Sequence, residues 1–306
     1  MKLAMIRVVT ADEAATIDAA AIASGAPSFE LMRAAGERAT NLILARFADR
    51  LANVVIFSGL GNNGGDGWIV AAVLALRGYH VRVEAAAEPR SEDARRAAAW
   101  YREIAPRPDD EAPEMPTLAI DALLGTGARG APRGDVARSI AEFARLRTLG
   151  VPIISLDIPS GLDATTGADD GAVTADLTIT FGTMKRGLLI ARGRSGAIVV
   201  LDIGLGVHAQ PTQGMFGLVD QHFVSTMVPG IPAESHKGLR RRIAIVGGDL
   251  GMAGATILAA RGAARSGVGM VRVIVEERSL VAAQVGIPEA TAAAWPSDDT
   301  TMSDAL

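Results

Sequence analysis

The sequence predicts an α/β protein whose main domain is a three-layer α/β/α sandwich around a mainly parallel sheet. Short apolar runs alternate with helical stretches along the first two thirds of the chain. These runs are too apolar for either face to meet water, as is typical of parallel strands covered on both sides. Three of them are followed directly by glycine-rich polar segments. A second, smaller α/β unit is predicted after a stretch without periodicity.

Two helices are predicted before the first central strand. Thr10-Ala-Asp-Glu13 is a capping box, and the helix that it opens can close at Gly25. A second helix is predicted from about Ser28 to Ala48. The apolar run Val54 to Phe57 is then the first strand of the sheet.

The rest of the main domain repeats this alternation. The pattern predicts helices over 67–77, 92–104 and 135–149, and strands over 79–85, 118–124, 151–156, 176–181 and 198–203. A Pro-rich loop is predicted over 106–116. Ligands of such sheets bind outside the carboxyl ends of the strands. Three of these ends carry NNGGD (62–66), GTGARGA (125–131) and DIPSGLD (157–163), so we expect one site where they converge.

The pattern breaks between residues 205 and 235, where Pro211, Pro229 and Pro232 interrupt it. We therefore expect domains over 1–210 and 236–306, joined by a linker over 211–235. The second domain is predicted to contain strands at 242–246 and 270–275, helices at 255–266 and 277–285, and a glycine-rich turn at 247–254. Two strands are few for an open α/β domain, so this unit is predicted to be incomplete, with a poorly anchored end beyond about residue 275.

Composition excludes several classes of function. The net charge of −4 provides no basic surface for nucleic acid. No apolar stretch reaches the ~20 residues that span a bilayer, so no membrane partner is expected. The chain has no cysteine, which excludes disulfides and zinc–thiolate sites; this composition fits a reducing cytosol and predicts a cytoplasmic location.

One motif suggests an alternative function. Gly59 to Gly64 reads G-x-G-x-x-G, and Glu84 follows 20 residues later, where a ribose-binding acid would lie in a dinucleotide-dependent oxidoreductase. However, Asn62, Asn63 and Asp66 place oxygens where a pyrophosphate prefers N–H groups. A non-catalytic nucleotide-binding scaffold is a second alternative.

Four longer motifs together resemble a known family. GLGNNGGDGWIVAAVLALRG, IDALLGTGARGAPRGDV, ISLDIPSGLDATTG and ADLTITFGTMKRGLL follow the order and spacing of NAD(P)H-hydrate epimerase, and the resemblance covers residues 10 to 205. Residues 235 to 273 resemble the opening of the ADP- or ATP-dependent NAD(P)H-hydrate dehydratase. The two domains are commonly fused in this order in bacteria.

The resemblance implies a Rossmann-like epimerase domain over 1–210 and an incomplete ribokinase-like dehydratase domain over 236–306. Its substrate would be a small molecule, NADH or NADPH hydrated at C6 of the nicotinamide ring, whose R and S forms are interconverted. A homo-oligomer is also expected. The later aspartate motif of the dehydratase, with its ADP or ATP site, is absent from the 306 residues, so this chain is expected to epimerise but not to dehydrate.

The resemblance also assigns individual site residues. Potassium would be held by Asn63, Asp121 and Ser160, and Asp157 would lie at the reacting ring. The implied substrate contacts are Asn62, Asn63, Gly64, Gly65, Asp66, Gly125, Thr126, Gly127, Ala128, Arg129, Gly130, Ala131, Asp157 and, in the second domain, Ala255.

The chemistry of the substrate makes Asp157 the predicted catalytic group. A C6 hydroxyl beside the ring nitrogen forms a hemiaminal, which can lose water to an iminium-like cation or open to an aldehyde. Both routes need proton transfer and support for positive charge, which a positioned carboxylate supplies. The structural alternative is that Asp157 only caps the turn at Ser160-Gly161. Lys185 is predicted to provide a positive charge near phosphate.

Overall fold

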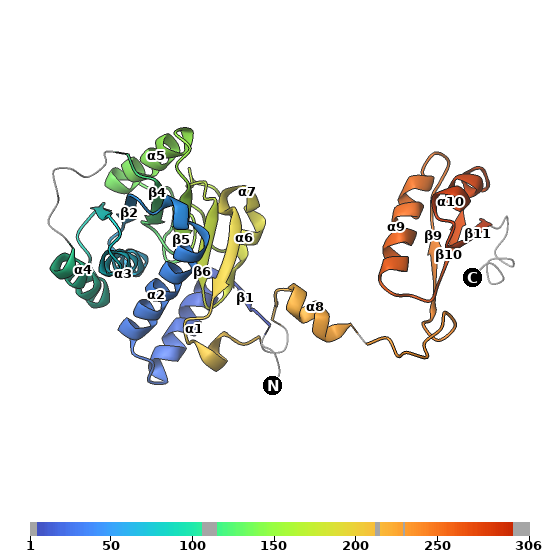
Figure 1. Ribbon diagram of the computed structural model, residues 1–306, viewed down its shortest axis with the longest axis horizontal. Helices are drawn as coiled ribbons and strands as arrows, with labels where there is room; N and C mark the ends of the chain where they lie inside the picture. The colour runs from blue at the N-terminus through green and yellow to red at the C-terminus, as the bar shows by residue number, and fades with distance from the viewer. Residues whose placement is uncertain (1–4, 106–114, 212–214, 229, 296–306) are drawn as a thin grey trace. The chain divides into compact units, whose positions relative to one another are not determined.

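The computed structural model describes residues 5–105, 115–211, 215–228 and 230–295 (Figure 1). The chain divides into two compact units, residues 1–225 and 226–306, and the division falls within the stretch 211–235. Most of the predicted loop over 106–116, and the end of the chain from residue 296, lie outside the described residues.

The first unit is built on a six-stranded sheet in which every pair of neighbours is parallel. The strand order is β3-β2-β4-β5-β6-β8. These strands are β2 (Val54–Ser58), β3 (Val81–Ala85), β4 (Leu118–Ala122), β5 (Ile153–Leu156), β6 (Leu177–Phe181) and β8 (Ala197–Leu201). Every residue of β2, β4, β5 and β6 is buried, as expected for strands covered on both faces. The predicted three-layer α/β class is therefore confirmed.

Helices cover both faces of this sheet (Figure 1). On one face, Val54 and Ile56 of β2 pack in a core with α2 (Ser28–Arg46), α3 (Asn62–Leu76) and α4 (Glu92–Ile104). On the other face, Val55 and Phe57 pack with α5 (Gly134–Thr148). Alternate residues of one strand thus enter different cores, because successive side chains point to opposite faces.

The N-terminal helix begins as predicted. The amide of Glu13 donates to Thr10 Oγ1 at 3.2 Å, and the amide of Thr10 donates to Glu13 Oε2 at 2.7 Å, which closes the capping box. The helix that follows is α1 (Ala11–Ala23), and Gly25 after it has a positive φ of 104°. Residues before α1 form the short strand β1 (Val8–Val9), which pairs with β7 (Met184–Lys185) and was not predicted.

The strand order places the reversal of the sheet between β2 and β4. From β2 the chain crosses outward to β3, and it then returns to β4 and continues to β5, β6 and β8 on the other side. Loops that leave two such strands in opposite directions open a crevice at their carboxyl ends, where open α/β sheets bind ligands.

The predicted start of the helix after β2 was wrong. Helix α3 begins at Asn62, five residues before the predicted start, so NNGGD forms its first turns rather than a loop. Asparagine and glycine have poor intrinsic helix propensity, but packing overrides it here. A Cβ at Gly65 would lie 2.6 Å from Met32 Sδ, and one at Gly67 would lie 2.6 Å from Ala122 Cβ. The glycines therefore let this turn lie directly against α2 and β4.

The end of the first unit contains several short elements that the sequence pattern did not indicate. These are α6 (Arg186–Ile190), α7 (Arg192–Ser195) and α8 (Gln221–Met227), the last of which lies where the pattern lacks periodicity.

The second unit contains a three-stranded parallel sheet in the order β11-β10-β9. Its elements are β9 (Arg242–Val246), α9 (Ala253–Arg265), β10 (Met270–Val275), α10 (Leu280–Gly286) and β11 (Thr291–Ala294). β11 was not predicted. Within the described ranges of both units, no helix combines the length and the apolar character that a membrane crossing requires.

Candidate functional site

A pocket of about 730 Å³ opens where the carboxyl ends of β2, β4 and β5 meet. The three polar segments that the sequence singles out all contribute to its wall, together with residues of α1 and α2. The polar lining includes Asn62, Asn63, Asp66, Thr126, Asp157 and Lys185. The predicted convergence therefore occurs at the reversal point of the sheet.

Asp157 is the first residue after β5, and its backbone has an uncommon conformation. Its φ is 63°, in the left-handed region that few residues other than glycine adopt. The backbone amide of Asp157 donates to Ile179 O at 2.7 Å, which ties this conformation to β6. Its carboxylate accepts from Lys185 Nζ at 2.7 Å, from the Thr126 amide at 3.2 Å and weakly from Thr180 Oγ1 at 3.4 Å. The sheet thus holds the carboxylate at the pocket wall.

Lys185 comes from β7 and is almost completely enclosed, with 4% of its side chain exposed. Besides Asp157, its ammonium group donates to Phe181 O at 2.9 Å. A buried ion pair of this kind strongly penalises removal of one partner, because the other charge is then left without compensation. The lysine therefore directs its charge to Asp157, and not, as the sequence suggested, to a phosphate.

Three further carboxyl groups line the same pocket, Asp66 from α3, Asp18 from α1 and Asp93 from α4. Burial raises the pKa of Asp66 well above its usual range; negative Asp157 and Asp18 raise it further, and Lys185 opposes them. Desolvation by the concave wall also raises the pKa of Asp18, although much of that side chain is open to solvent. With four carboxyl groups and one ammonium group among its described lining residues, the pocket favours positive charge.

Asp121, at the end of β4, has a different environment and is fully buried. Its carboxylate accepts from Ser160 Oγ at 2.5 Å, from the Ser160 amide at 2.8 Å, from Ser155 Oγ at 2.9 Å and from the Leu123 amide at 3.2 Å. Burial raises the pKa of Asp121, while these hydrogen bonds act to lower it. Asp121, and not Asp157, caps the turn at Ser160, so the structural alternative for Asp157 does not hold.

Asn63 lies beside this network and contains an unsatisfied oxygen. Its Nδ2 donates to Leu124 O at 2.8 Å and to Leu156 O at 3.1 Å. The buried Asn63 Oδ1 has no hydrogen-bond partner among the described residues. The Leu124 amide donates to Ser160 Oγ at 2.9 Å, so the Leu124 backbone connects Asn63 with Ser160.

The three predicted cation ligands are thus brought together by the structure. They offer an amide oxygen, a carboxylate and a hydroxyl, a set of hard oxygen donors that suits alkali and alkaline-earth ions and does not suit soft metals. The orphaned Asn63 Oδ1 is the atom that a cation would satisfy. In the described part of the chain, no cluster of three or more His, Cys, Asp or Glu residues could hold a metal ion.

Other predicted substrate contacts lie outside the wall of this pocket. Gly64 and Gly65 are buried beneath it, where they allow close packing. Arg129 points to α1, donating to Asp12 Oδ1 at 2.9 Å. Ala255 lies on α9 in the second unit. The predicted loop residues in the wall are Gly125, Thr126, Gly127 and Ala128, whereas Arg129, Gly130 and Ala131 are exposed beyond it.

Sequence reasoning missed the contribution of the first two helices. Asp18, Ile22, Leu31 and Met32 line the pocket, yet in the sequence they look like ordinary members of amphipathic helices. A sequence motif around Asp18 would have been needed to predict that these helices contribute to the pocket. Asp18 is an isolated aspartate on a helix, so the sequence offers no such motif.

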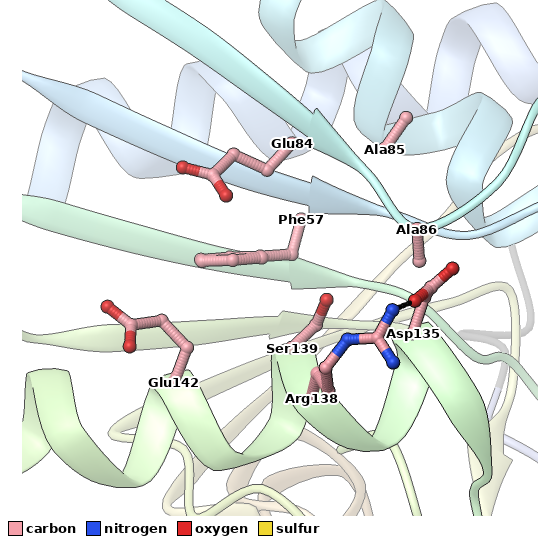
Figure 2. Close-up of a pocket in the computed structure, with 8 residues that line it drawn as sticks. All are labelled: Phe57, Glu84, Ala85, Ala86, Asp135, Arg138, Ser139 and Glu142. Atoms are coloured by element: carbon pink, nitrogen blue, oxygen red, sulfur yellow. Dashed lines mark ion pairs between the residues drawn. The ribbon is translucent and has the colours of Figure 1, made fainter.

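A second, shallower hollow of about 390 Å³ lies on the α5 side of the sheet (Figure 2). Phe57 and Glu84 contribute from strands, and Asp135, Arg138 and Glu142 contribute from α5. Its charges compensate one another: Arg138 pairs with Asp135, Arg145 with Glu142, and Arg82 with Glu84. Glu84 is therefore not in the pocket that contains Asn62 and Asp66, so the geometry does not support the oxidoreductase alternative.

Comparisons with known proteins agree with this architecture. Residues 28–187 match the family described as YjeF-related protein N-terminus, and residues 243–306 match NAD(P)H-hydrate dehydratase. The bifunctional NAD(P)H-hydrate repair enzyme Nnr of Hyperthermus butylicus is 37% identical over 280 residues, which cover 87% of this chain and 50% of that protein. Its Escherichia coli counterpart is 36% identical over 277 residues, 87% of this chain and 52% of that protein.

The chain therefore spans about half the length of the curated relatives that it matches. A crystal structure of a yeast protein, ynu0, aligns with a TM-score of 0.56 at 19% identity and covers 70% of this chain and 100% of that one. This likeness shows that the two share a fold. Because the first family match covers more than half of the 306 residues, the chain belongs to the family of YjeF-related protein N-terminal domains.

Proposed function

We propose that the first unit is an NAD(P)H-hydrate epimerase, which interconverts the R and S forms of hydrated NADH or NADPH. The observation that carries the proposal is the carboxylate of Asp157, held beside Lys185 at the convergence of three polar strand ends. The relatives' printed name, a repair enzyme for NAD(P)H hydrate, supports the same substrate. A volume of about 730 Å³ lies within the range of small-molecule and cofactor sites.

The charge of the pocket suits this reaction. Loss of water from C6 of the hydrated ring leaves a cation that the ring nitrogen stabilises. Asp157 keeps its carboxylate at a fixed place through the Lys185 and Thr126 contacts, so no reorganisation is needed as positive charge develops. Asp18, exposed on α1, adds to the negative potential of this wall.

The nucleotide's diphosphate is assigned to the segment from Gly125 to Ala131, toward its exposed end at Arg129 and away from Asp157. This segment offers backbone N–H groups and the guanidinium of Arg129, whereas the acidic wall would repel phosphate. The exposed ion pair of Arg129 with Asp12 contributes little stability, so the guanidinium can exchange that partner for a phosphate.

Potassium is the cation that we assign to Asn63, Asp121 and Ser160. When bound, it would supply positive charge that offsets the buried carboxylate of Asp121. The same three residues connect α3 with the segments after β4 and β5, so their arrangement sets where Asp157 and Thr126 lie.

Asp121→Ala is expected to weaken binding of potassium and of the hydrated nucleotide together. The wild-type protein should gain thermal stability when potassium replaces lithium at constant ionic strength, and the variant should not. Because Asp121→Ala also leaves four buried donors without an acceptor, it is compared with Asn63→Ala, which removes the orphaned oxygen. An equal response to potassium in all three proteins would show that Asp121 is only structural.

For the second unit we infer a segment of a ribokinase-like dehydratase, a domain that as a whole acts with ADP or ATP. The match over residues 243–306 supports this assignment, as does the parallel sheet with its glycine-rich turn at 247–254. Ala255 follows this turn, where the substrate contact is expected. A homo-oligomeric state is a further proposal, based on the resemblance.

The proposal is tested by adding the purified protein to a mixture enriched in one epimer. We expect the approach to the equilibrium ratio, followed by chromatography, to be accelerated in proportion to the protein added. NADH absorbance is recorded in parallel, with and without ADP or ATP. Hydride transfer or an unchanged epimer ratio would contradict the epimerase assignment, and nucleotide-dependent NADH formation would show that this chain also dehydrates.

A further inference from the structure

We propose that Asp66 is a second acid–base group of the pocket, which holds a proton in the free protein and gives it to the departing C6 hydroxyl of the hydrated ring. This inference rests on the proposed epimerase function. It divides between two carboxyl groups the work that the sequence assigned to Asp157 alone.

The first support is the lack of partners at Asp66. Asp66 lies in the early turns of α3 and lines the same pocket as Asp157. Asp157 and Asp121 accept several hydrogen bonds each, as carboxylates do. The Asp66 carboxyl has no hydrogen bond or ion pair within the described ranges of the chain, and only the more distant charge of Lys185 favours its ionised form.

The second support is the charge that surrounds Asp66. Asp18 on α1, Asp93 at the start of α4 and Asp157 after β5 line the pocket with it. Lys185 provides the one ammonium group among the described lining residues, and it lies 2.7 Å from Asp157. A partly buried carboxyl among like charges keeps its proton to higher pH. The pKa of Asp66 is raised accordingly, mainly by burial and further by Asp157 and Asp18.

The two carboxyl groups therefore differ in what they can do. Asp157 receives an ammonium group on one oxygen and an amide N–H on the other, so it is suited to remain an anion beside a developing cation. Asp66 is suited to donate a proton. Enzyme active sites often contain two carboxyl groups whose different environments give them different pKa values. One then acts as the acid and the other stays ionised and stabilises positive charge.

The proposed step conserves atoms and electrons. The proton of Asp66 moves to the C6 hydroxyl oxygen, the C6–O bond breaks with its electron pair going to the oxygen, and water leaves. The ring nitrogen's lone pair forms the C=N bond of the iminium cation, and Asp66 is left as a carboxylate. When water adds to the opposite face, the nitrogen recovers its lone pair and the released proton returns to Asp66 through pocket water.

The kinetic test compares the pH dependence of epimer exchange in the wild type, Asp66→Asn and Asp66→Glu. The wild-type rate should fall as pH rises through the pKa of Asp66, because the proton to be donated is lost. Asp66→Asn should lose about 10²–10⁴ in rate together with this dependence. Asp66→Glu, which can still carry a proton, should retain the dependence and part of the rate. The control is Asp170→Asn, which removes a carboxylate at an exposed position of the loop after β5.

The outcomes separate this inference from the epimerase proposal. If the wild type does not accelerate exchange, the epimerase proposal fails. If the wild type accelerates exchange and Asp66→Asn keeps its rate within a few-fold and its pH dependence, the role of Asp66 is refuted.

A spectroscopic measurement tests the proton itself. The infrared difference between the wild type and Asp66→Asn should contain the band of a protonated carboxyl at pH values above the usual range of aspartate. Burial also raises the pKa of Asp121, but Asp121 is present in both proteins, so its band cancels in the difference spectrum. A carboxylate band in place of the protonated one would overturn the inference regardless of activity.

The pH dependence of the free energy of unfolding is a third, independent test of whether Asp66 holds a proton. At pH values below the pKa of aspartate in the unfolded chain, Asp66 is protonated in both the folded and the unfolded protein. In that range it does not make the free energy of unfolding depend on pH. As pH rises from there through the raised folded pKa, the unfolded chain releases a proton that the folded chain retains, so wild-type stability falls. Asp66→Asn should lack this fall and should therefore exceed the wild type in melting temperature at higher pH. Parallel curves for the two proteins would contradict the inference.

Discussion

Asp157→Asn is expected to lower the protein's acceleration of epimer exchange by about 10²–10⁴, the usual contribution of a catalytic acid, base or charge. Asparagine keeps the shape of the side chain and removes its charge. The Lys185 ammonium group, only 4% exposed, then faces an uncharged amide at the place where the cation develops. The rate is measured by chromatography of the two epimers at saturating substrate.

The same substitution should also destabilise the fold, because one partner of a buried ion pair remains. The double variant Asp157→Asn/Lys185→Met distinguishes the two effects. Removing both charges should recover melting temperature relative to the single variant, while exchange stays slow. Asp170→Asn is the matched control on the exposed loop. Exchange by Asp157→Asn within a few-fold of the wild type would remove Asp157 from the reaction.

Gly64→Ala is expected to lower the stability of the fold strongly. A Cβ at this position would overlap the carbonyl oxygen of Gly59 and would lie 2.9 Å from Ser58 Oγ. The Gly59 backbone cannot move away freely, because its amide donates to Ala122 O of β4 at 3.0 Å. Overpacking of this kind costs about 1–3 kcal/mol or more, and the first turn of α3, with Asn63, would be displaced.

Gly61→Ala is the matched control for Gly64→Ala. It adds the same methyl group to the same segment, at a residue where no atom lies within 4 Å and where φ is −95°. Thermal unfolding should be impaired in Gly64→Ala and nearly normal in Gly61→Ala; Gly61 lines the pocket, so this control applies to stability and not to substrate binding. Equal melting temperatures for the two variants would mean that the close approach of α3 to Gly59 is not needed.

The parallel arrangement of the strands in the main domain could be predicted from local patterns, whereas their order came only from the structure. The strands β2, β4, β5 and β6 are mostly apolar, and helices of crossover length connect the strands from β2 to β5, whereas β5 and β6 are joined without a helix. Chirality and the burial of both faces then leave parallel neighbours as the stable solution. The positions of the three polar segments at carboxyl ends followed from the same reasoning.

Local sequence patterns gave wrong predictions where tertiary packing outweighs the intrinsic helix or strand propensity of the residues. NNGGD has poor helix propensity, yet it begins a helix because Gly65 allows contact with Met32 and the following Gly67 allows contact with Ala122. The strand β11 was missed because its sequence, Thr291–Ala294, contains three alanines and lacks the branched residues typical of strands.

The sequence by itself determined the α/β class, the parallel sheet and the three polar strand ends, since these depend on hydrophobic periodicity and turn chemistry within short windows. Only the tertiary structure decided the roles of the carboxyl groups. Asp121 and Asp157 both follow apolar runs, but one is saturated by Ser155 and Ser160 and the other pairs with Lys185 at the pocket wall. Proton affinity depends on burial and on charges brought from distant parts of the chain, and no local pattern encodes those distances.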